Sequence, residues 1–191
     1  MSKIKVGPRT LFYPRPVLLI GANVNGKPNF MTIAGGGGVN AEPPMFAVPI
    51  GHSRYTLRGI RQNLTFSINV PSVDLVRETD YCGSASGSEV DKVEVCKFKV
   101  FYGELNSAPL IEQCPVNIEC AVVHLLDLGT HSLVIGRLEE THISEGCLTD
   151  GKLDPNKVNP MVYTTQGRQY LTLGQVIANA GSAGQELKAK E

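Results

Sequence analysis

The dipeptide Asn25-Gly26, with apolar residues on both sides, is the feature of this chain that most restricts its fold. Asparagine and glycine adopt positive φ angles with little strain, which is what a tight hairpin turn requires. The flanking apolar segments are Pro16–Val24 and Lys27–Ala34. We therefore expect two antiparallel strands joined at this turn.

A second pair of long apolar segments, Val116–Leu126 and His131–Glu139, encloses the turn-forming residues Asp127–Thr130 and predicts a second hairpin. Alternating apolar residues predict another strand at Leu64–Val70. Pro49 interrupts a shorter apolar run and indicates an edge strand or a bulge.

Helical patterns are few. We expect a helix at Ser53–Asn63, with Ser53 as its N-cap and with Leu57 and Ile60 facing a core. Shorter helices are expected at Val73–Tyr81 and Val90–Lys97. Several hairpins, 20 glycines and no regular alternation of strands and helices predict a mainly β fold, a closed or nearly closed antiparallel barrel with a few short flanking helices.

Length and charge restrict the class of protein. A chain of 191 residues fits one domain, 1–191, with a flexible C-terminal tail from about residue 181. Its 18 basic and 18 acidic side chains argue against broad electrostatic binding to nucleic acid or to an anionic membrane. The longest apolar run, Val17–Ile20, is far too short to span a membrane, and we expect a cytoplasmic protein without a secretory leader.

Several familiar motifs fail at a decisive residue. The spacing of Gly21–Lys27 matches a phosphate-binding P-loop, but Pro28 follows where a hydroxyl residue should bind magnesium. In Gly83–Gly87, Ala85 occupies the place of a nucleophilic serine. Five cysteines without a CxxC spacing predict free packing thiols, and four histidines without metal-ligand spacing predict no metal site.

The segment His52–Thr56 is more informative, because Ser53, Arg54 and Thr56 gather at the expected start of a helix. Backbone N–H groups at a helix N-terminus attract anions, and a guanidinium can add a bidentate charge-assisted pair. A phosphate site is therefore one interpretation. Ser53 as a simple N-cap beside a solvated Arg54 is the other.

The order of motifs from residue 14 to residue 174 resembles the flavin reductase-like proteins with an FMN-binding split barrel, a family that includes flavoredoxin. The motifs that carry the resemblance are Pro14-Arg-Pro-Val, Gly26-Lys-Pro-Asn-Phe-Met-Thr-Ile-Ala34, Glu42-Pro-Pro-Met-Phe-Ala-Val48, Ser53-Arg-Tyr-Thr56, Phe66-Ser-Ile-Asn-Val-Pro71, Cys82-Gly-Ser-Ala-Ser-Gly87, Asp91-Lys92, His131-Ser-Leu-Val-Ile-Gly136 and Tyr170-Leu-Thr-Leu-Gly174. The chain departs from the family at Gly35–Gly38, where a bulky aromatic residue is common.

The resemblance implies a homodimer of antiparallel split barrels that binds FMN tightly but noncovalently beside the dimer interface. It implies that the strand carrying Asn29, Met31, Thr32, Ile33 and Ala34 lies along the flavin ring. It places the FMN phosphate at Ser53, Arg54 and Thr56. Lys92 would reach the phosphate or the ribityl chain, or be a solvated helix lysine. His131 would lie near the flavin face as a catalytic residue, or make a structural hydrogen bond.

Three functions follow from this resemblance. The first is an NAD(P)H-dependent flavin oxidoreductase in which NADH or NADPH binds transiently and electrons pass through FMN to a flavin or protein acceptor. The second is a flavoredoxin-like electron carrier that does not itself oxidise NAD(P)H. The third is a ligand-binding barrel without redox turnover.

Overall fold

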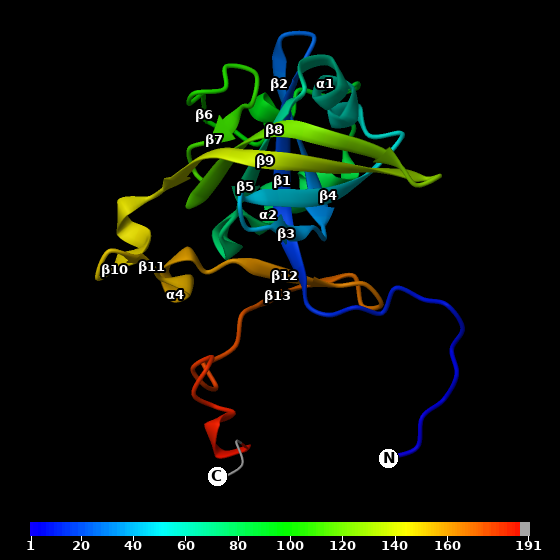
Figure 1. The fold of residues 1–191 in the computed structure, drawn as a ribbon. Coiled ribbons are helices and arrows are strands. Elements are labelled where there is room, and N and C mark those ends of the chain that lie inside the picture. The colour runs from blue at the N-terminus through cyan, green and yellow to red at the C-terminus, as the bar shows by residue number, and fades with distance from the viewer. Residues whose placement is uncertain (188–191) are drawn as a thin grey trace.

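The computed structural model describes residues 1–187 and shows an antiparallel sheet that does not close on itself (Figure 1). The hydrogen-bonded order is β13-β12-β1-β5-β8-β9-β4-β3, and β2 pairs with β1. The strands are β1 Arg15–Val24, β2 Lys27–Ala34, β3 Gly37–Asn40, β4 Met45–Gly51, β5 Thr65–Val70, β6 Val100–Phe101, β7 Leu110–Ile111, β8 Val116–Asp127, β9 His131–Ile143, β10 Leu148–Thr149, β11 Lys152–Leu153, β12 Met161–Thr164 and β13 Gln169–Thr172. The prediction of a mainly β, antiparallel fold is confirmed, and the sheet is open rather than fully closed, as the expected split barrel requires.

The first predicted hairpin is present as β1 and β2. Asn25 and Gly26 have φ angles of 52° and 79°, and Val24 pairs with Lys27 across the turn. Both central residues therefore adopt the left-handed conformation that tight hairpins need. The conformational preference of Asn25 and Gly26 therefore determines where β2 begins, and the candidate site lies along this strand.

The second predicted hairpin is present as β8 and β9; β8 continues one residue further than expected, to Asp127, and β9 four residues further, to Ile143. Pro49 lies in β4, which pairs with β9 on one side. On the other side, the pairing with β3 reaches only Ala47. Pro49 therefore lies where β4 has become an edge strand, which is compatible with its missing N–H.

β1 is buried on both faces, which explains its unbroken apolar sequence. Leu18 and Ile20 belong to a core shared with α1 (Tyr55–Asn63), β5 and β9. Leu19 points to a second core that includes Phe30 and Cys82. The central strand thus connects the sheet interior to the side of the molecule where α2 (Val76–Ser84) and α3 (Lys92–Val95) lie.

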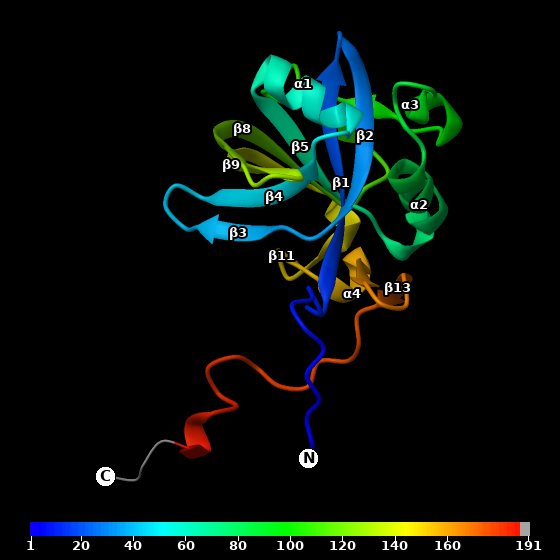
Figure 2. The same ribbon diagram turned by 90° about the vertical axis from the view of Figure 1, so that its right-hand side faces the viewer.

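The helices cover two sides of the sheet, with α1 at one end and α2 and α3 beside β2 (Figure 2). A Cβ atom on Gly59 of α1 would lie 2.3 Å from the Asn23 carbonyl oxygen, so this glycine lets α1 approach β1 closely. The remaining helical elements are η1 Val73–Leu75, η2 Glu145–Cys147, α4 Pro155–Val158 and η3 Gln185–Leu187.

Two expectations about these helices need correction. The N-cap of α1 is Arg54 rather than Ser53, and within the described residues no side chain caps this helix. The helix expected at Val90–Lys97 is limited to α3, because the Asp91 side chain caps it by accepting bonds from the backbone of Val93 and Glu94. The glycine loop that departs from the family pattern is partly ordered as β3.

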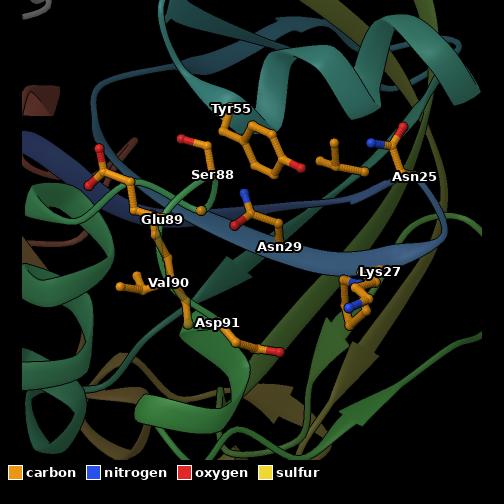
Figure 3. A pocket seen from close by; sticks show the side chains of 12 residues that line it. Asn25, Lys27, Asn29, Tyr55, Ser88, Glu89, Val90 and Asp91 are labelled. Carbon is orange, nitrogen blue, oxygen red and sulfur yellow. The ribbon is translucent and has the colours of Figure 1, made fainter.

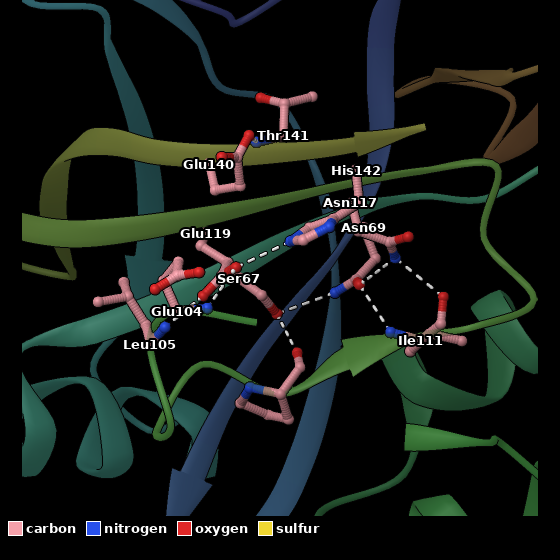
Figure 4. Close-up of polar contacts among 11 residues, drawn as sticks. Ser67, Asn69, Glu104, Leu105, Ile111, Asn117, Glu119, Glu140, Thr141 and His142 are labelled. Carbon is pink, nitrogen blue, oxygen red and sulfur yellow. Dashed lines mark hydrogen bonds and ion pairs between the residues drawn. The ribbon is translucent and has the colours of Figure 1, made fainter. Parts of the chain in front are cut away.

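Buried polar side chains attach the segment at residues 103–111 to the sheet (Figure 4). The Asn69 Oδ1 atom accepts hydrogen bonds from the Ile111 N–H at 2.9 Å and from Asn117 Nδ2 at 2.7 Å. Glu119 is completely buried, and its carboxylate accepts bonds from the N–H groups of Glu104 and Leu105. Because these backbone donors are satisfied by side chains, the segment can pack as an irregular loop.

The terminal segments extend away from the sheet on the same side of the molecule (Figure 1). Within the described residues, no helix is long and apolar enough to cross a membrane. The expected flexible tail from about residue 181 falls partly on residues 188–191, which lie outside the described part of the chain.

Candidate functional site

Three neighbouring pockets follow strand β2 on the side where α2 and α3 pack. We call them the turn-side pocket, the central pocket and the tyrosine pocket. Their cavity volumes are about 370, 200 and 290 Å³. The central pocket is lined by Asn29, Met31, Ser53, Arg54, Tyr55, Thr56, Ser84, Ala85, Ser86, Gly87 and Lys92. Six of the ten candidate site residues predicted from the sequence therefore line this one pocket.

A buried hydrogen bond joins two of the nominated residues at the bottom of the central pocket. Asn29 on β2 and Thr56 on α1 are 5% and 1% exposed, and Asn29 Nδ2 donates to Thr56 Oγ1 at 2.7 Å. Because the threonine oxygen is the acceptor in this bond, its own proton remains available for an acceptor in the pocket. The pair thus fixes a hydroxyl donor where an anion could bind.

The N-terminus of α1 supplies further donors. The first N–H groups of any helix lack intrahelical partners, and the first turn of α1 carries no acidic side chain. Arg54 is exposed at this end and its Nη1 atom donates to the Gly83 carbonyl oxygen at 3.1 Å. That bond holds the guanidinium at the pocket and leaves its other N–H groups free for a ligand.

Lys92 is buried, so the interpretation as a solvated helix lysine is wrong. Its side chain is 4% exposed, and Nζ donates to the carbonyl oxygens of Phe30 at 3.0 Å and of Cys82 at 2.8 Å. Burial is the main cause that lowers the pKa of Lys92 from its usual value. Two of the three ammonium protons tie β2 to α2, and Lys92 also lines both the central and the turn-side pockets.

The remaining nominated residues of β2 face different directions. Thr32 and Ala34 line the tyrosine pocket, where the Thr32 hydroxyl donates to the Thr79 carbonyl oxygen. The side chain of Ile33 is buried in the core on the opposite face of the strand. Only the backbone of Ile33 is therefore in a position to meet a ligand lying along β2.

The tyrosine pocket continues the central pocket, because Arg54 and Ser84 line both. Tyr163 and Tyr170 line its far side, with ring centroids 5.6 Å apart. The Tyr170 hydroxyl donates to Asp80 Oδ1 at 3.0 Å. Burial together with this bond raises the pKa of Tyr170 to about 12. The pocket therefore offers aromatic surface beside the backbone of β2.

The structure places His131 outside the lining of the three pockets. It is exposed at the start of β9, opposite Gly51 of β4, and its Nδ1 atom shares a hydrogen bond of 2.8 Å with Thr130 Oγ1. A Cβ atom on Gly51 would lie 3.7 Å from His131 Nε2 and 3.8 Å from Arg54 Cγ. His131 thus lies near the base of the Arg54 side chain.

Sequence reasoning did not nominate Tyr55 or the segment Ser84–Gly87, although these residues form much of the central pocket wall. The available signal was the run of small residues at Cys82–Gly87, which permits a backbone to approach a ligand closely. A Cβ atom on Gly87 would lie 1.9 Å from Asn29 Oδ1 and 3.0 Å from Tyr55 Cδ1. Only glycine fits between these two side chains.

The lining of the central pocket has the chemistry of a phosphate site. It is surrounded by hydroxyl donors, a guanidinium, an ammonium and a helix N-terminus. Among the described residues, no carboxylate lines this pocket. The turn-side pocket, in contrast, is lined by the carboxylates of Glu89 and Asp91 (Figure 3). An anion is therefore expected in the central pocket.

Comparison with solved structures supports the fold and the arrangement of these elements. Flavoredoxin from Methanosarcina acetivorans is 41% identical, with a TM-score of 0.94 over 98% of this chain and 100% of that one. Flavoredoxin of Desulfovibrio vulgaris (Miyazaki F) is 35% identical, with a TM-score of 0.90 over 96% of this chain and all of that one.

A domain from Shewanella frigidimarina described as a split barrel shares the fold at 17% identity, with a TM-score of 0.78 over 87% of this chain and 86% of that one. The open antiparallel sheet is therefore the predicted split barrel. The model of the flavin reductase like domain matches residues 10–172, which include every strand of the sheet. The chain belongs to the flavin reductase-like family.

Proposed function

We propose that this protein binds FMN, with the phosphate in the central pocket and the flavin ring along β2 in the tyrosine pocket. The observation that carries the proposal is the joint presence of Asn29, Thr56, Arg54 and Lys92 around one cavity at the N-terminus of α1. When bound, FMN would supply the hydride and electron-transfer chemistry. The similarity to two flavoredoxins supports the choice of cofactor.

The residues of the chain have distinct parts in this proposal. Ser53, Thr56 and the first N–H groups of α1 donate to the phosphate, while Arg54 pairs with its charge. The backbone from Met31 to Ala34 offers peptide groups to the polar edge of the flavin ring. Lys92 holds β2 and α2 together and directs its remaining N–H toward the phosphate end of the site.

We further propose that the protein is an NAD(P)H-dependent flavin oxidoreductase. The family assignment supports this activity, and the exposure of His131 beside Arg54 suits a group that contacts a transiently bound nicotinamide nucleotide. A flavoredoxin-like electron carrier is the second candidate. It is favoured by the similarity to flavoredoxin over nearly the whole chain.

A visible absorption spectrum tests both proposals. The purified protein is loaded with FMN, freed of excess and mixed anaerobically with NADH or NADPH. A retained flavin spectrum that bleaches with either nucleotide supports the reductase, and a retained spectrum that resists both supports the carrier. Loss of all flavin during gel filtration would contradict the FMN site itself.

The contribution of His131 is tested by substitution. We expect His131→Ala to slow reduction of the flavin by nicotinamide nucleotide while FMN stays bound. The control is Thr141→Ala, because Thr141 is an exposed residue of the same strand β9 that lines none of the three pockets. Equal reduction rates in the two variants would remove His131 from the catalytic role.

A homodimer completes the proposed function. Support comes from large apolar side chains near the outer end of the β8–β9 hairpin, where Val123, Leu125, Leu126 and Leu128 are 37–62% exposed. Apolar groups gathered at a surface commonly mark an interface. Sedimentation equilibrium tests the proposal: a mass of two chains supports it, and a mass of one chain contradicts it.

A further inference from the structure

Cys82 and Cys96 are neighbours in the structure, and neither side chain has a part in the proposed flavin site. Cys82 lies in α2 and is completely buried, whereas Cys96 is half-buried at the end of α3. Their Sγ atoms are 4.0 Å apart, at the limit of a hydrogen bond between thiols. Among the described residues, no other two thiols are joined by such a contact. The two thiols are therefore placed to react with each other.

Tertiary packing brings these two sulfurs together. The cysteines are 14 positions apart, and the helices that carry them both pack against β2 (Figure 2). Cys82 belongs to the second core, beside Phe30 and Phe98, and Cys96 packs against the edge of that core. The sulfurs thus meet at the border of a packed core, where one thiol is enclosed and the other reaches the surface.

The two thiols differ in how readily they lose a proton. Burial raises the pKa of both. At Cys96 a hydrogen bond from the Cys82 thiol opposes this rise, because it stabilises the Cys96 thiolate. The Lys92 ammonium acts in the same direction as that bond, and the Glu78 carboxylate acts against it. Cys96 is therefore the first of the two to form a thiolate, and it is also the one that a dissolved oxidant reaches.

A disulfide between Cys82 and Cys96 requires only a local movement. The S–S bond of a disulfide is about 2.05 Å long, so the two sulfurs must approach by about 2 Å. Cys96 follows a helix of only four residues and is partly exposed, so rotation about its Cα–Cβ bond can bring its sulfur inward. The buried Cys82 is the fixed partner in this movement.

The segment between the two cysteines forms a wall of the central pocket. It contains Ser84–Gly87 and Lys92, which line that pocket. Lys92 Nζ donates to the Cys82 carbonyl oxygen at 2.8 Å, so a hydrogen bond already holds the two ends of the segment together. A bond between the two sulfurs would close a covalent ring around the segment and reduce its freedom to open. Oxidation would therefore stiffen the pocket wall without placing a new group in the pocket.

We propose that Cys82 and Cys96 are a site of reversible oxidation, at which hydrogen peroxide converts the two thiols into a disulfide that braces the wall of the central pocket. The Cys96 thiolate attacks one oxygen of the peroxide, the O–O bond breaks, and hydroxide leaves and takes up the proton that Cys96 released. Cys96 is then a sulfenic acid. The Cys82 sulfur attacks the Cys96 sulfur, the S–S bond forms, and the S–O bond breaks to release water with the Cys82 proton. In sum, two thiols lose two electrons and one peroxide becomes two waters.

Peptide mapping of the full chain tests the pairing, and the test needs no flavin. The reduced protein is treated with hydrogen peroxide under native conditions, its remaining thiols are blocked with iodoacetamide in urea, and it is digested with trypsin. Cleavage after Lys and Arg places Cys82 in the peptide 78–92 and Cys96 in the peptide 93–97. Cys114 and Cys120 fall together in the peptide 100–137. We expect mass spectrometry to find 78–92 joined to 93–97, and dithiothreitol to separate them.

Cys96→Ser is the decisive variant, and Cys147→Ser is its matched control. Cys147 is also half-buried, but its Sγ donates to the Lys157 carbonyl oxygen at 3.7 Å, and in the described part of the chain no second thiol shares a hydrogen bond with it. We expect the control to give the joined peptides in the same yield as the unaltered protein. In Cys96→Ser we expect Cys82 to remain a thiol, because it is enclosed by the core. Circular dichroism checks that both variants keep the β fold.

Hydrogen exchange measures the effect on the pocket wall. We expect the amides of residues 84–90 to exchange at least about threefold more slowly in the oxidised protein than in the reduced protein, because a covalent ring opposes local opening. The amides of residues 124–131, at the far end of the β8–β9 hairpin, are the internal control and should not change. Equal exchange of residues 84–90 in the two states would contradict the bracing of the wall.

Three results of the peptide map would overturn the site itself. The first is the absence of joined peptides after oxidation of the native, unaltered protein. The second is a bond from 78–92 to 100–137, which would assign the buried partner of Cys82 to another thiol. The third is a bond from Cys96 to a second chain instead of to Cys82. None of these results bears on the proposed FMN site, because flavin binding is measured separately.

Discussion

Replacement of Arg54 by alanine is the most direct test of the phosphate site. Arg54 is exposed at the N-terminus of α1, and one of its N–H groups is already used by the Gly83 carbonyl. A hydrogen bond to a charged group contributes about 1.5–3 kcal/mol, and about 1.4 kcal/mol corresponds to a tenfold change in Kd. We expect Arg54→Ala to weaken FMN binding by roughly 10- to 100-fold, nearer the lower limit because of solvent screening.

Riboflavin and a second arginine make this experiment specific. Riboflavin lacks the phosphate, so its affinity for the Arg54→Ala variant should stay within about twofold of that for the unaltered protein. Arg58 lies one turn further along α1, with its guanidinium 5.6 Å from the centre of the Tyr55 ring, and Arg58→Ala controls for the loss of one positive charge. Fluorescence titration measures the affinity of the unaltered protein and of both variants for FMN and for riboflavin. An equal loss of FMN and riboflavin binding, or no loss of either, would refute the phosphate assignment.

Three further predictions concern stability and titration. Glu119→Leu removes the acceptor of two backbone N–H groups. It should therefore lower the free energy of unfolding, measured in urea, by at least about 2 kcal/mol. As a control, loss of the exposed Glu112 carboxylate should change this free energy by less than about 1 kcal/mol. Burial raises the pKa of three thiols, so Ellman's reagent should leave them unmodified in the native protein at neutral pH and modify them in urea; these are Cys82, Cys114 and Cys120. Rapid reaction of all three in the native protein would contradict their burial. The pKa of Tyr170 rises from 10.0 to about 12 on folding, so its contribution to stability is present below pH 10 and is lost as the pH rises toward 12. Ultraviolet titration should show a late tyrosinate step that is absent in Tyr170→Phe.

Much of the sheet could be predicted because its turns are specified by adjacent residues. Asn25 and Gly26 adopt positive φ in the structure for the same reason that they indicated a hairpin, namely the low cost of this conformation for Asn and Gly. The apolar pattern of α1 correctly placed Leu57 and Ile60 in the core. The N-cap was wrong because a serine two residues before the helix resembles a capping residue in sequence, whereas the actual cap depends on the backbone path.

The open sheet was not predictable from strand patterns. Hairpins define which neighbouring strands pair, but they do not define whether the first and last strands of a sheet meet. Here β13 and β3 lie at opposite ends of the order. β1 pairs with β12 at Arg15 and Pro16, and further along the strand it pairs with β2 on one edge and with β5 on the other. The position of a strand with several partners depends on long-range packing on both of its faces.

The sequence by itself determined the two hairpins, the apolar strand β1 and the hydroxyl and guanidinium groups that precede α1. Only the tertiary structure decided how those groups are used. It buried Lys92 between β2 and α2, turned Ile33 toward the core and brought Gly87 against Tyr55, 32 positions earlier in the chain. Local conformational preference specifies turns and strands, but a pocket is formed by contacts between distant segments, and those depend on the packing of the whole chain.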